Sequence, residues 1–527
     1  MDRKSGITTV EMIDFYANIR GSSPALSQRD RTLSYQQLAS QAKELASAMQ
    51  LAGIGIDDRV AVLSLNRIEQ LVIIYATMKI GAIYVPINFR LAAPELKYIL
   101  QDSRAKALFF EADLLPDMDG FLAELPDLDC SVLLDAKSSP NICGWDEFMG
   151  SGKATPKLCH AQADQAVYQM YTSGTTGFPK GVVITQQQLA IYVVLSSMIP
   201  PRMSMEVPQL CVAPLFHAAG LCSAITALSC GRWVSIMREF NPQSFVETLV
   251  NEKIADTLVV PAMLQAIVHT VDNLQDYDFS HLKKITYGAS PISEDLLRKS
   301  IDIFDCDFQQ AFGMTEMVAG VTILTAEDHH RALTDKPGLM RSCGRAAPFT
   351  KIKIIDPQTG AELPCNQVGE IIVQAPFMMQ GYSQQPEKTA QAIQAGWYHT
   401  GDGGYMDDEG YVYIKDRIKD MIISGGENVY PAEVENALAS HPQIADSAVI
   451  GLPDQKYGQA VVAICVATDQ LAPPDAESLI DSCRQKIAGY KIPRHYYFVD
   501  ELPRNASGKL LKKDLREQFE TTTTTAK

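Results

Sequence analysis

The segment 171–181, YTSGTTGFPKG, concentrates residue types that bind anions. It contains three glycines, four Ser or Thr hydroxyls and one lysine. Glycines let successive backbone N–H groups turn toward an anion, hydroxyls add donors, and a lysine adds positive charge. Strand-like sequences, AVYQM and GVVIT, flank the segment. We therefore expect a loop that binds polyphosphate through Thr172, Ser173, Gly174, Thr175, Thr176, Gly177 and Lys180.

This loop differs from the common P-loop pattern GxxxxGK[ST]. Pro179 stands where that pattern requires its second glycine, and Gly181 follows Lys180 where Ser or Thr is required. A flexible polar turn without a ligand is the alternative interpretation of the segment. The rest of the chain decides between the two.

Six further segments follow in order along the chain. They are APLFHAAG (213–220), YGASPIS (287–293), QQAFGMTE (309–316), GWYHTGD (396–402), KDRIKDMIISGGENVYPAEVE (415–435) and PRNASGKLLKKDL (503–515). With YTSGTTGFPKG they resemble the motifs of the adenylate-forming superfamily, which contains acyl-CoA synthetases, peptide-synthetase adenylation domains and beetle luciferases. The similarity is greatest to the acyl-CoA synthetases and extends over most of the chain. It implies that ATP and a carboxylic acid form acyl-AMP and pyrophosphate, after which CoA displaces AMP.

The resemblance also assigns residues to the adenylation step, in which two anions must meet, so that positioning and charge neutralisation dominate catalysis. It implies that Thr315 contacts the α-phosphate and that Glu316 holds Mg²⁺. It implies that Lys509 reaches the α-phosphate and the substrate carboxylate from a separate C-terminal domain. The implied contacts to the base and the ribose come from Gly288, Ala289, Ser290, Phe312, Gly313, Met314, Asp402 and Arg417.

Some of these residues also have ordinary structural interpretations. A Thr-Glu pair such as Thr315-Glu316 is common at a helix start, and Asp402 could be a turn residue that bonds its own backbone. Lys509 would otherwise belong to a solvated basic tail. Phe312 departs from the family pattern, in which Tyr is usual, but a phenyl ring can still stack on adenine.

The composition pattern changes near residue 415, where a turn-rich stretch leads into a new strand, DMIIS (420–424), and a helix that begins at Pro431. The resemblance implies a hinge at Lys419 and a path for the pantetheine thiol along Gly425, Gly426 and Glu427. We therefore predict an N-terminal domain of residues 1–418 and a small, mobile α+β domain of residues 419–527.

Buried strands and amphipathic helices alternate in the preceding part of the chain. Apolar runs occur at 59–65, 82–87, 106–112, 233–237, 256–261 and 283–288. One helix is predicted after Ser34, with Leu38, Ala42, Leu45 and Met49 on one face and its end near Gly53. This alternation predicts an α/β fold of mainly parallel sheets flanked by helices. The resemblance adds a β-barrel-like subdomain.

The neighbourhood of His217 bears on the identity of the acid. Acyl-CoA synthetases often carry His at this position, and we assign it to the pocket or its gate, since a lone His among apolar residues is more often packed than catalytic. Relatives that activate amino acids carry an Asp nearby, and residues 213–227 contain none. The expected acyl lining is uncharged, which favours an apolar monocarboxylate, fatty or aryl. It comprises Ala218, Ala219, Gly220, Met263, Leu264, Met317, Val318 and Ala319.

Composition excludes several other classes of protein. The 527 residues carry a net charge of −16, which argues against a general nucleic-acid binder but not against small polyanions. The 11 cysteines occur singly, and the chain shows neither a signal peptide nor an apolar run that could span a bilayer. We expect a cytoplasmic protein that uses ATP, Mg²⁺ and CoA, and leave a homodimer open.

The leading hypothesis is an ATP-dependent acyl-CoA synthetase. An acyl-AMP ligase that loads a carrier protein is the main alternative. A luciferase-like oxygenase is less favoured because the chain ends in TAK rather than a peroxisomal SKL-type signal. A non-catalytic nucleotide-binding protein is disfavoured because it would have no use for Lys180, Glu316, Asp402 and Lys509 together.

Overall fold

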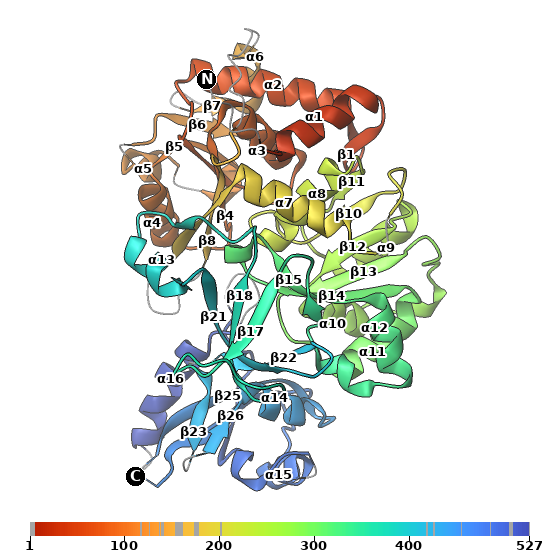
Figure 1. Cartoon of the computed structure of the whole chain (residues 1–527), viewed down its shortest axis with the longest axis vertical. Coiled ribbons are helices and arrows are strands. Elements are labelled where there is room, and N and C mark those ends of the chain that lie inside the picture. The colour runs from red at the N-terminus through yellow and green to blue at the C-terminus, as the bar shows by residue number, and fades with distance from the viewer. Residues whose placement is uncertain are drawn as a thin grey trace.

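The computed structural model describes residues 6–115, 118–125, 127–135, 138, 142–152, 162–172, 179–200, 203–417, 420–424, 427–454, 456–484, 486–504 and 510–525. Two large sheets form the upper part of the molecule in Figure 1, and the C-terminal residues form its lower end. This is the mixed α/β architecture that the sequence predicts.

One large sheet has eight strands. Across the sheet they are β19 (Gly381–Tyr382), β9 (Lys180–Thr185), β8 (Ala166–Thr172), β4 (Ile83–Ile87), β3 (Arg59–Leu63), β5 (Ala105–Phe110), β6 (Cys130–Leu133) and β7 (Cys143–Gly144). The strands from β8 to β7 are parallel, whereas β9 pairs antiparallel with β8 and β19 pairs antiparallel with β9. The apolar runs predicted at 59–65, 82–87 and 106–112 are β3, β4 and β5, which are buried as central parallel strands must be.

The other large sheet has nine strands. Across the sheet they are β16 (Arg345–Ala346), β15 (Gly320–Leu324), β14 (Asp307–Gly313), β13 (Lys284–Gly288), β12 (Asp256–Val259), β10 (Gln209–Cys211), β11 (Val234–Ile236), β1 (Pro24–Gln28) and β2 (Arg31–Ser34). The central strands from β14 to β1 are parallel. Their carboxyl ends therefore meet at one edge, where open α/β sheets bind ligands.

Helices cover the two sheets and fill the space between them. They are α1 (Thr9–Ile19), α2 (Tyr35–Leu51), α3 (Ile68–Ile80), α4 (Ala93–Ser103), α5 (Met118–Ala123), α6 (Trp145–Ser151), α7 (Gln186–Ser197), α8 (Ala218–Ser229), α9 (Pro242–Asn251), α10 (Pro261–Thr270), α11 (Glu294–Phe304), α12 (Ala326–Thr334) and α13 (Pro386–Ala392). The predicted helix after Ser34 is α2, which buries its expected face and begins with a capping box between Ser34 and Gln37. Helix α7 packs on β8 and β9, α8 packs on β10, β11 and β12, and the two helices pack on each other.

The remaining sheets are mainly antiparallel. One contains β17 (Lys351–Ile355), β18 (Gly369–Gln374), β21 (Trp397–Met406), β20 (Ile393–Gln394) and β22 (Val412–Arg417) and occupies the place expected for a barrel-like subdomain. The C-terminal sheet contains β24 (Glu427–Val429), β23 (Ile422–Ser424), β26 (Gly458–Ala467), β25 (Ile444–Asp454) and β27 (His495–Phe498). Its helices are α14 (Pro431–Ala439), α15 (Ala476–Arg484) and α16 (Lys512–Thr525).

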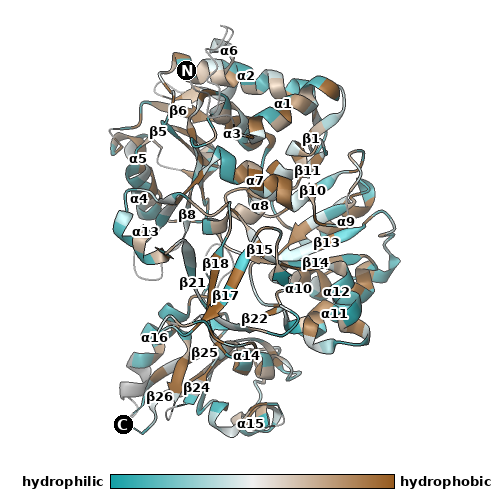
Figure 2. Ribbon diagram, viewed as in Figure 1, coloured by the Kyte–Doolittle hydropathy of each residue, from teal (hydrophilic) through white to brown (hydrophobic). Residues whose placement is uncertain are grey.

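Hydrophobic residues follow this layering. Figure 2 shows the hydrophobic colour along β17, β18 and β25, whereas α11 and α12 carry hydrophilic residues on the side that faces away from the sheet. The C-terminal sheet has hydrophobic clusters of its own on both faces, which include Ile422 and Val449 on one side and Ile450 and Leu515 on the other. An independent core of this kind is what a separate domain requires.

Candidate active site

The polyphosphate-binding loop predicted from the sequence is held by two paired strands. Thr172 at the end of β8 is the register partner of Lys180 at the start of β9. The intervening Ser173, Gly174, Thr175, Thr176 and Gly177 lie outside the described residues. Lys180 Nζ lies 4.7 Å from the ring centroid of Tyr382, and burial lowers the pKa of Lys180 while Glu316 opposes the shift.

Glu316 lies close to this lysine although it is far away in sequence. It belongs to a 3₁₀ turn, Thr315–Met317, and only 9% of the residue is exposed. The Tyr382 hydroxyl donates a hydrogen bond of 2.9 Å to Glu316 Oε1, and the Met379 backbone N–H donates one of 2.7 Å to the Glu316 carbonyl oxygen. Tyr382 thus touches both predicted motifs, Lys180 through its ring and Glu316 through its hydroxyl. No sequence motif marks Tyr382.

A tight turn at Val318 fixes the direction of the chain after Glu316. Val318 has φ +61° and ψ −59°, and the Ala319 N–H donates a 2.6 Å hydrogen bond to the Met317 carbonyl. These values define a γ-turn of the rare, strained type, which is unusual for a β-branched residue. The turn brings the Ala319 carbonyl to the Met314 N–H at 2.9 Å. A Cβ on Gly313 would overlap that carbonyl, so the site requires glycine there.

The strip expected beside the base, residues 288–290, lies at the carboxyl end of β13. Gly288 ends the strand, and Ala289 follows with φ +67°, so the chain turns sharply at Ser290. Tyr287 points to the opposite face, where its hydroxyl lies 2.9 Å from His329 Nε2. Phe312 lies on the next strand, β14, and is partly buried against the main core. It is not among the residues that line the cavity described below.

The two residues expected at the ribose are neighbours across a strand pair. Asp402 on β21 is the register partner of Arg417 on β22. Asp402 is 6% exposed, and its backbone N–H donates to the Thr400 hydroxyl at 3.0 Å. The side chain of Arg417 lies outside the described part of the chain.

A cavity of about 1340 Å³ extends from these motifs into the space between the nine-stranded sheet and α8. Gly288, Ala289, Ser290, Gly313, Met314 and Thr315 line its nucleotide end. The expected acyl residues His217, Ala218, Ala219, Met263 and Ala319 also line it. Gly220, Leu264, Met317 and Val318 do not, and the last three lie in the protein cores with no exposed surface. Arg232, Asp256 and Lys284 line it too, so its lining is not uniformly uncharged.

His217 precedes α8 and is neutral near pH 7, because burial lowers its pKa to about 4 and Arg90 adds to the shift. Its Nε2 has no hydrogen-bond partner among the described residues. The segment before it is clamped by Asn66, whose Oδ1 accepts from the Leu215 N–H at 2.8 Å and whose Nδ2 donates to the Ala213 carbonyl at 3.1 Å. Asn66 therefore positions the segment that carries His217, and no sequence motif marks it.

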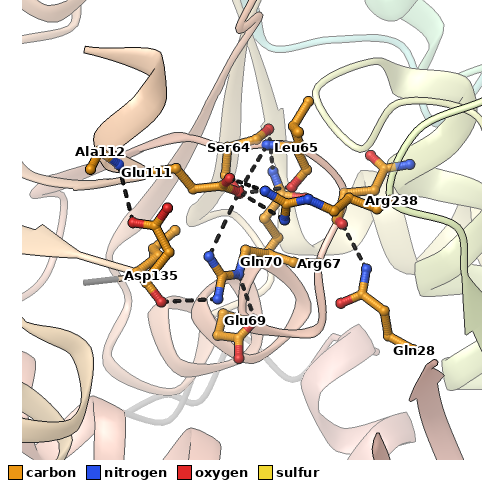
Figure 3. Close-up of polar contacts among 12 residues, drawn as sticks. Gln28, Ser64, Leu65, Arg67, Glu69, Gln70, Glu111, Ala112, Asp135 and Arg238 are labelled. Atoms are coloured by element: carbon orange, nitrogen blue, oxygen red, sulfur yellow. Dashed lines mark hydrogen bonds and ion pairs between the residues drawn. The ribbon is translucent and has the colours of Figure 1, made fainter. Parts of the chain in front are cut away.

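A buried ionic network includes Ser64 and Arg67, which are close to Asn66 in sequence (Figure 3). Glu111, which directly follows β5, accepts hydrogen bonds from the Ser64 hydroxyl at 2.5 Å and from Arg238. Arg67 donates to Glu69 at 2.7 Å and to the Leu134 carbonyl at 2.9 Å. Because Arg238 follows β11 of the other sheet, the network joins both large sheets beside the cavity.

The C-terminal part reaches the cavity through Leu511, which lines it. Lys509, two residues earlier, lies outside the described residues, as do Lys419, Gly425 and Gly426. Glu427 is exposed on β24 and is the register partner of Ser424 on β23. The predicted strand and helix are β23 and α14, with one additional short strand, β24, before the helix.

Comparison with known proteins agrees with this geometry. The sequence profile described as "AMP-binding enzyme" matches residues 15–383, and that of the "AMP-binding enzyme C-terminal domain" matches residues 433–509. The chain belongs to the AMP-binding enzyme family. The adenylate-forming superfamily inferred from the motifs is thereby confirmed.

Curated relatives in this family cover nearly the whole chain. A fatty acid–[acyl-carrier-protein] ligase, ScoC, from Streptomyces coeruleorubidus is 37% identical over 97% of this chain and 96% of its own length. An indoleacetate–CoA ligase from Aromatoleum aromaticum is 35% identical over 96% of this chain and 97% of its own. The chain is thus an adenylate-forming acyl ligase by family.

Solved structures of AMP-binding enzymes show the same fold. O-succinylbenzoate CoA synthetase from Bacillus subtilis, in complex with its acyl-adenylate intermediate, has a TM-score of 0.85 at 28% identity, with 97% of this chain and 98% of that chain covered. A fatty acyl CoA synthetase from Mycobacterium tuberculosis has a TM-score of 0.74 at 32% identity, with 98% and 99% covered. Another structure of the Bacillus enzyme contains ATP and a magnesium ion.

Within the described ranges, no group of three or more His, Cys, Asp or Glu side chains could hold a metal ion. No described helix is both long enough and apolar enough to cross a membrane.

Proposed function

We propose that this AMP-binding enzyme is an ATP-dependent acyl-CoA synthetase. The carboxylate oxygen of the acid attacks the α-phosphorus of ATP and pyrophosphate leaves; the CoA thiol then attacks the acyl carbon, loses its proton and displaces AMP. One observation carries the proposal: a single cavity is lined by Thr315, by the Gly288–Ser290 strip and by the segment that contains His217. Nucleotide and acyl chain can therefore meet inside one cavity.

We assign the adenylation roles as follows. Lys180 and the loop before it bind the β- and γ-phosphates, Thr315 binds the α-phosphate, and Lys509 neutralises charge as the carboxylate approaches. Asp402 and Arg417 bind the ribose. The proximity of Lys180 and Glu316 to one side chain, Tyr382, supports this arrangement because it places the two motifs together.

Magnesium fits the chemistry of Glu316. Tyr382 donates to Oε1 and Tyr398 also hydrogen-bonds the carboxylate, but a carboxylate has about four lone-pair sites and can still bind a metal. Mg²⁺ prefers few protein oxygens, with phosphate and water completing its shell. A bound Mg²⁺ would neutralise phosphate charge. A metal held by one carboxylate and phosphates needs no cluster of acidic side chains.

For the second step we propose a domain boundary between residues 418 and 419, with Lys419 as the hinge. Gly425, Gly426 and Glu427 would then line the path of the pantetheine arm. The separate hydrophobic clusters of the C-terminal sheet support a unit that can rotate as a body. We place the reaction in the cytoplasm, and the free thiols of the ten described cysteines support a reducing compartment.

A second candidate function is an acyl-AMP ligase that loads a carrier protein, because one relative of 37% identity is such a ligase. The test is pyrophosphate release from ATP with a panel of fatty and aryl acids, followed by thioester formation with either CoA or a phosphopantetheinylated carrier protein. Acid-dependent pyrophosphate release and acyl-CoA formation support the proposal. Thioester on the carrier alone favours the second candidate, and activity only with amino acids contradicts both.

A further inference from the structure

The cavity lining is polar where it reaches the amino end of β13, away from the nucleotide strip. Side chains alternate along a strand, so Lys284, Thr286 and Gly288 of β13 share one face, and all three line the cavity. Gly288 marks the nucleotide end. Lys284 lies four residues away, about 13 Å along an extended strand. The cavity therefore follows β13 from the reacting end to a distal end at Lys284.

Most polar groups at this distal end satisfy one another. Arg232 forms an ion pair with Asp256, and its other amino group donates to Gln209 Oε1 at 3.2 Å. Gln209 Nε2 in turn donates to the Ser223 hydroxyl at 2.5 Å. Asp256 is 4% exposed, so this pair is shielded from bulk water. The charge of Asp256 is thus already matched by Arg232.

Among the described residues, three side-chain donor groups at this end have no hydrogen-bond partner. The Lys284 ammonium group makes no hydrogen bond or ion pair with any residue that the structure describes, although Asp256 and Asp307 are the register partners of Lys284 on the two neighbouring strands. Arg232 Nε and the Thr226 hydroxyl are buried and likewise have no partner within the described ranges. All three residues line the cavity.

Covering these unpaired donor groups with hydrocarbon alone would cost binding free energy. Burial lowers the pKa of Lys284, since water is partly excluded and Arg232 adds repulsion, whereas Asp256 and Asp307 oppose the shift. A methyl terminus would cover the ammonium group without replacing its lost hydration. A carboxylate would accept hydrogen bonds from Lys284 and Arg232 and replace the lost hydration of the ammonium group.

We propose that the distal end of the cavity is an anion subsite, and that the acid is a dicarboxylate whose second carboxylate binds Lys284. The proposal rests on the proposed function and narrows its substrate class. The intervening lining near Ala219 and Met263 contacts the apolar middle of the chain. Lys284 is then a specificity-determining residue that does not touch the reacting atoms.

The test compares dicarboxylic acids, from hexanedioic to hexadecanedioic acid, with monocarboxylic acids of equal length in the pyrophosphate assay. We expect the wild-type enzyme to favour a dicarboxylate by about tenfold or more in kcat/KM, mainly through KM. Lys284→Met should abolish that preference and Lys284→Arg should retain most of it. Lys283→Met is the matched control, because the adjacent Lys283 is exposed and donates to the Ser280 carbonyl at 2.6 Å.

A wild-type preference for monocarboxylates, or an equal loss for both acid classes in Lys284→Met, would overturn the proposal. Calorimetric binding of the dicarboxylates separates this result from a failure of the proposed function, because it needs no turnover. Weaker dicarboxylate binding to Lys284→Met than to Lys283→Met supports the subsite even if no pyrophosphate is released. Equal binding to the two variants refutes it.

Discussion

Tyr382 joins Lys180 to Glu316. Its hydroxyl donates a 2.9 Å hydrogen bond to Glu316 Oε1, and its ring centroid lies 4.7 Å from Lys180 Nζ. The contact depends on β19, the two-residue strand that pairs Tyr382 with Val182 at the edge of the eight-stranded sheet. A residue outside all seven sequence motifs therefore orients the carboxylate that we assign to magnesium.

Replacement of Tyr382 by Phe should weaken the magnesium dependence of adenylation. The ring and its contact with Lys180 remain, whereas the hydrogen bonds of the hydroxyl with Glu316 and Tyr398 are lost. Because a hydrogen bond to a charged group contributes about 1.5–3 kcal/mol, we expect at least a tenfold higher half-saturating Mg²⁺ concentration in pyrophosphate release. Tyr405→Phe, whose ring stacks on Tyr413 in the antiparallel sheet, is the control. An unchanged magnesium titration in Tyr382→Phe would remove the orienting role.

Gly313→Ala should damage both stability and adenylation. The new Cβ would overlap the Ala319 carbonyl that the γ-turn at Val318 places against Gly313. Overpacking against backbone costs about 1–3 kcal/mol in unfolding free energy, and the displaced turn carries Thr315 and Glu316. Gly338→Ala is the matched control, since a Cβ there meets open space. If the two variants lose equal stability and equal activity, the turn does not restrain the site.

Lys512→Met should destabilise the C-terminal sheet and helix α16. Lys512 Nζ lies 2.8 Å from Glu435 Oε1 and 3.7 Å from Asp416 Oδ2. Burial alone would lower the pKa of Lys512, but the two carboxylates outweigh it and raise the pKa. Removal of one partner of a buried pair costs about 3–5 kcal/mol. Lys513→Met, at an exposed ion pair with Glu517, should cost less than about 1 kcal/mol.

Tryptophan fluorescence would not report on the C-terminal part, because the three tryptophans, Trp145, Trp233 and Trp397, all precede it. Hydrogen exchange is therefore the suitable measurement for Lys512→Met. Exchange should accelerate in α16 and β25 of Lys512→Met and remain unchanged in β3 and β4. The double variant Lys512→Met with Glu435→Gln should recover part of the loss. Uniform acceleration across the chain would contradict a local role.

Acid should destabilise the protein through His329. Its Nδ1 donates to the Thr325 carbonyl at 2.7 Å, so Nε2 accepts from the Tyr287 hydroxyl, and burial lowers the pKa of His329 to about 4. The unfolded chain binds the proton near pH 6.5 and the folded chain only near pH 4. The free energy of unfolding therefore falls as pH decreases through this window, by at most about 3 kcal/mol. The nearby charged groups are Asp307, Asp328 and His330.

Urea unfolding at pH 7.5, 6 and 5 measures this dependence. His329→Gln stays neutral throughout, so it should unfold more easily than wild type at pH 7.5 but lose less stability on acidification. His217, whose pKa is also lowered to about 4, contributes a residual slope in both proteins. Parallel slopes for the wild type and His329→Gln would show that His329 does not titrate in this range.

Local patterns predicted the strands, the helix after Ser34 and the motif residues, because each depends on a few adjacent side chains. Asn66 and Tyr382 could not be found in this way, since their partners lie on strands far apart in sequence. Val318 was expected in the pocket with its neighbours, but the γ-turn directs it into the core. Lys284 had a usable signal: in KKITYG, the period-two alternation places it on the face of Gly288.

Lys509→Ala should separate the two half-reactions. Leu511, which follows Lys509 by two residues, lines the cavity, and this motivates the test. Adenylation brings a carboxylate to a polyphosphate and needs that cation, whereas attack of a thiol on acyl-AMP does not. We expect carboxylate-dependent pyrophosphate release to fall by about 10²-fold or more, while thioester formation from supplied acyl-AMP stays near the wild-type rate. Lys513→Ala, at an exposed position in the first turn of α16, is the control for the loss of one positive charge in this part of the chain. An equal loss in both half-reactions would mean that Lys509 supports the fold of the C-terminal part rather than the adenylation step.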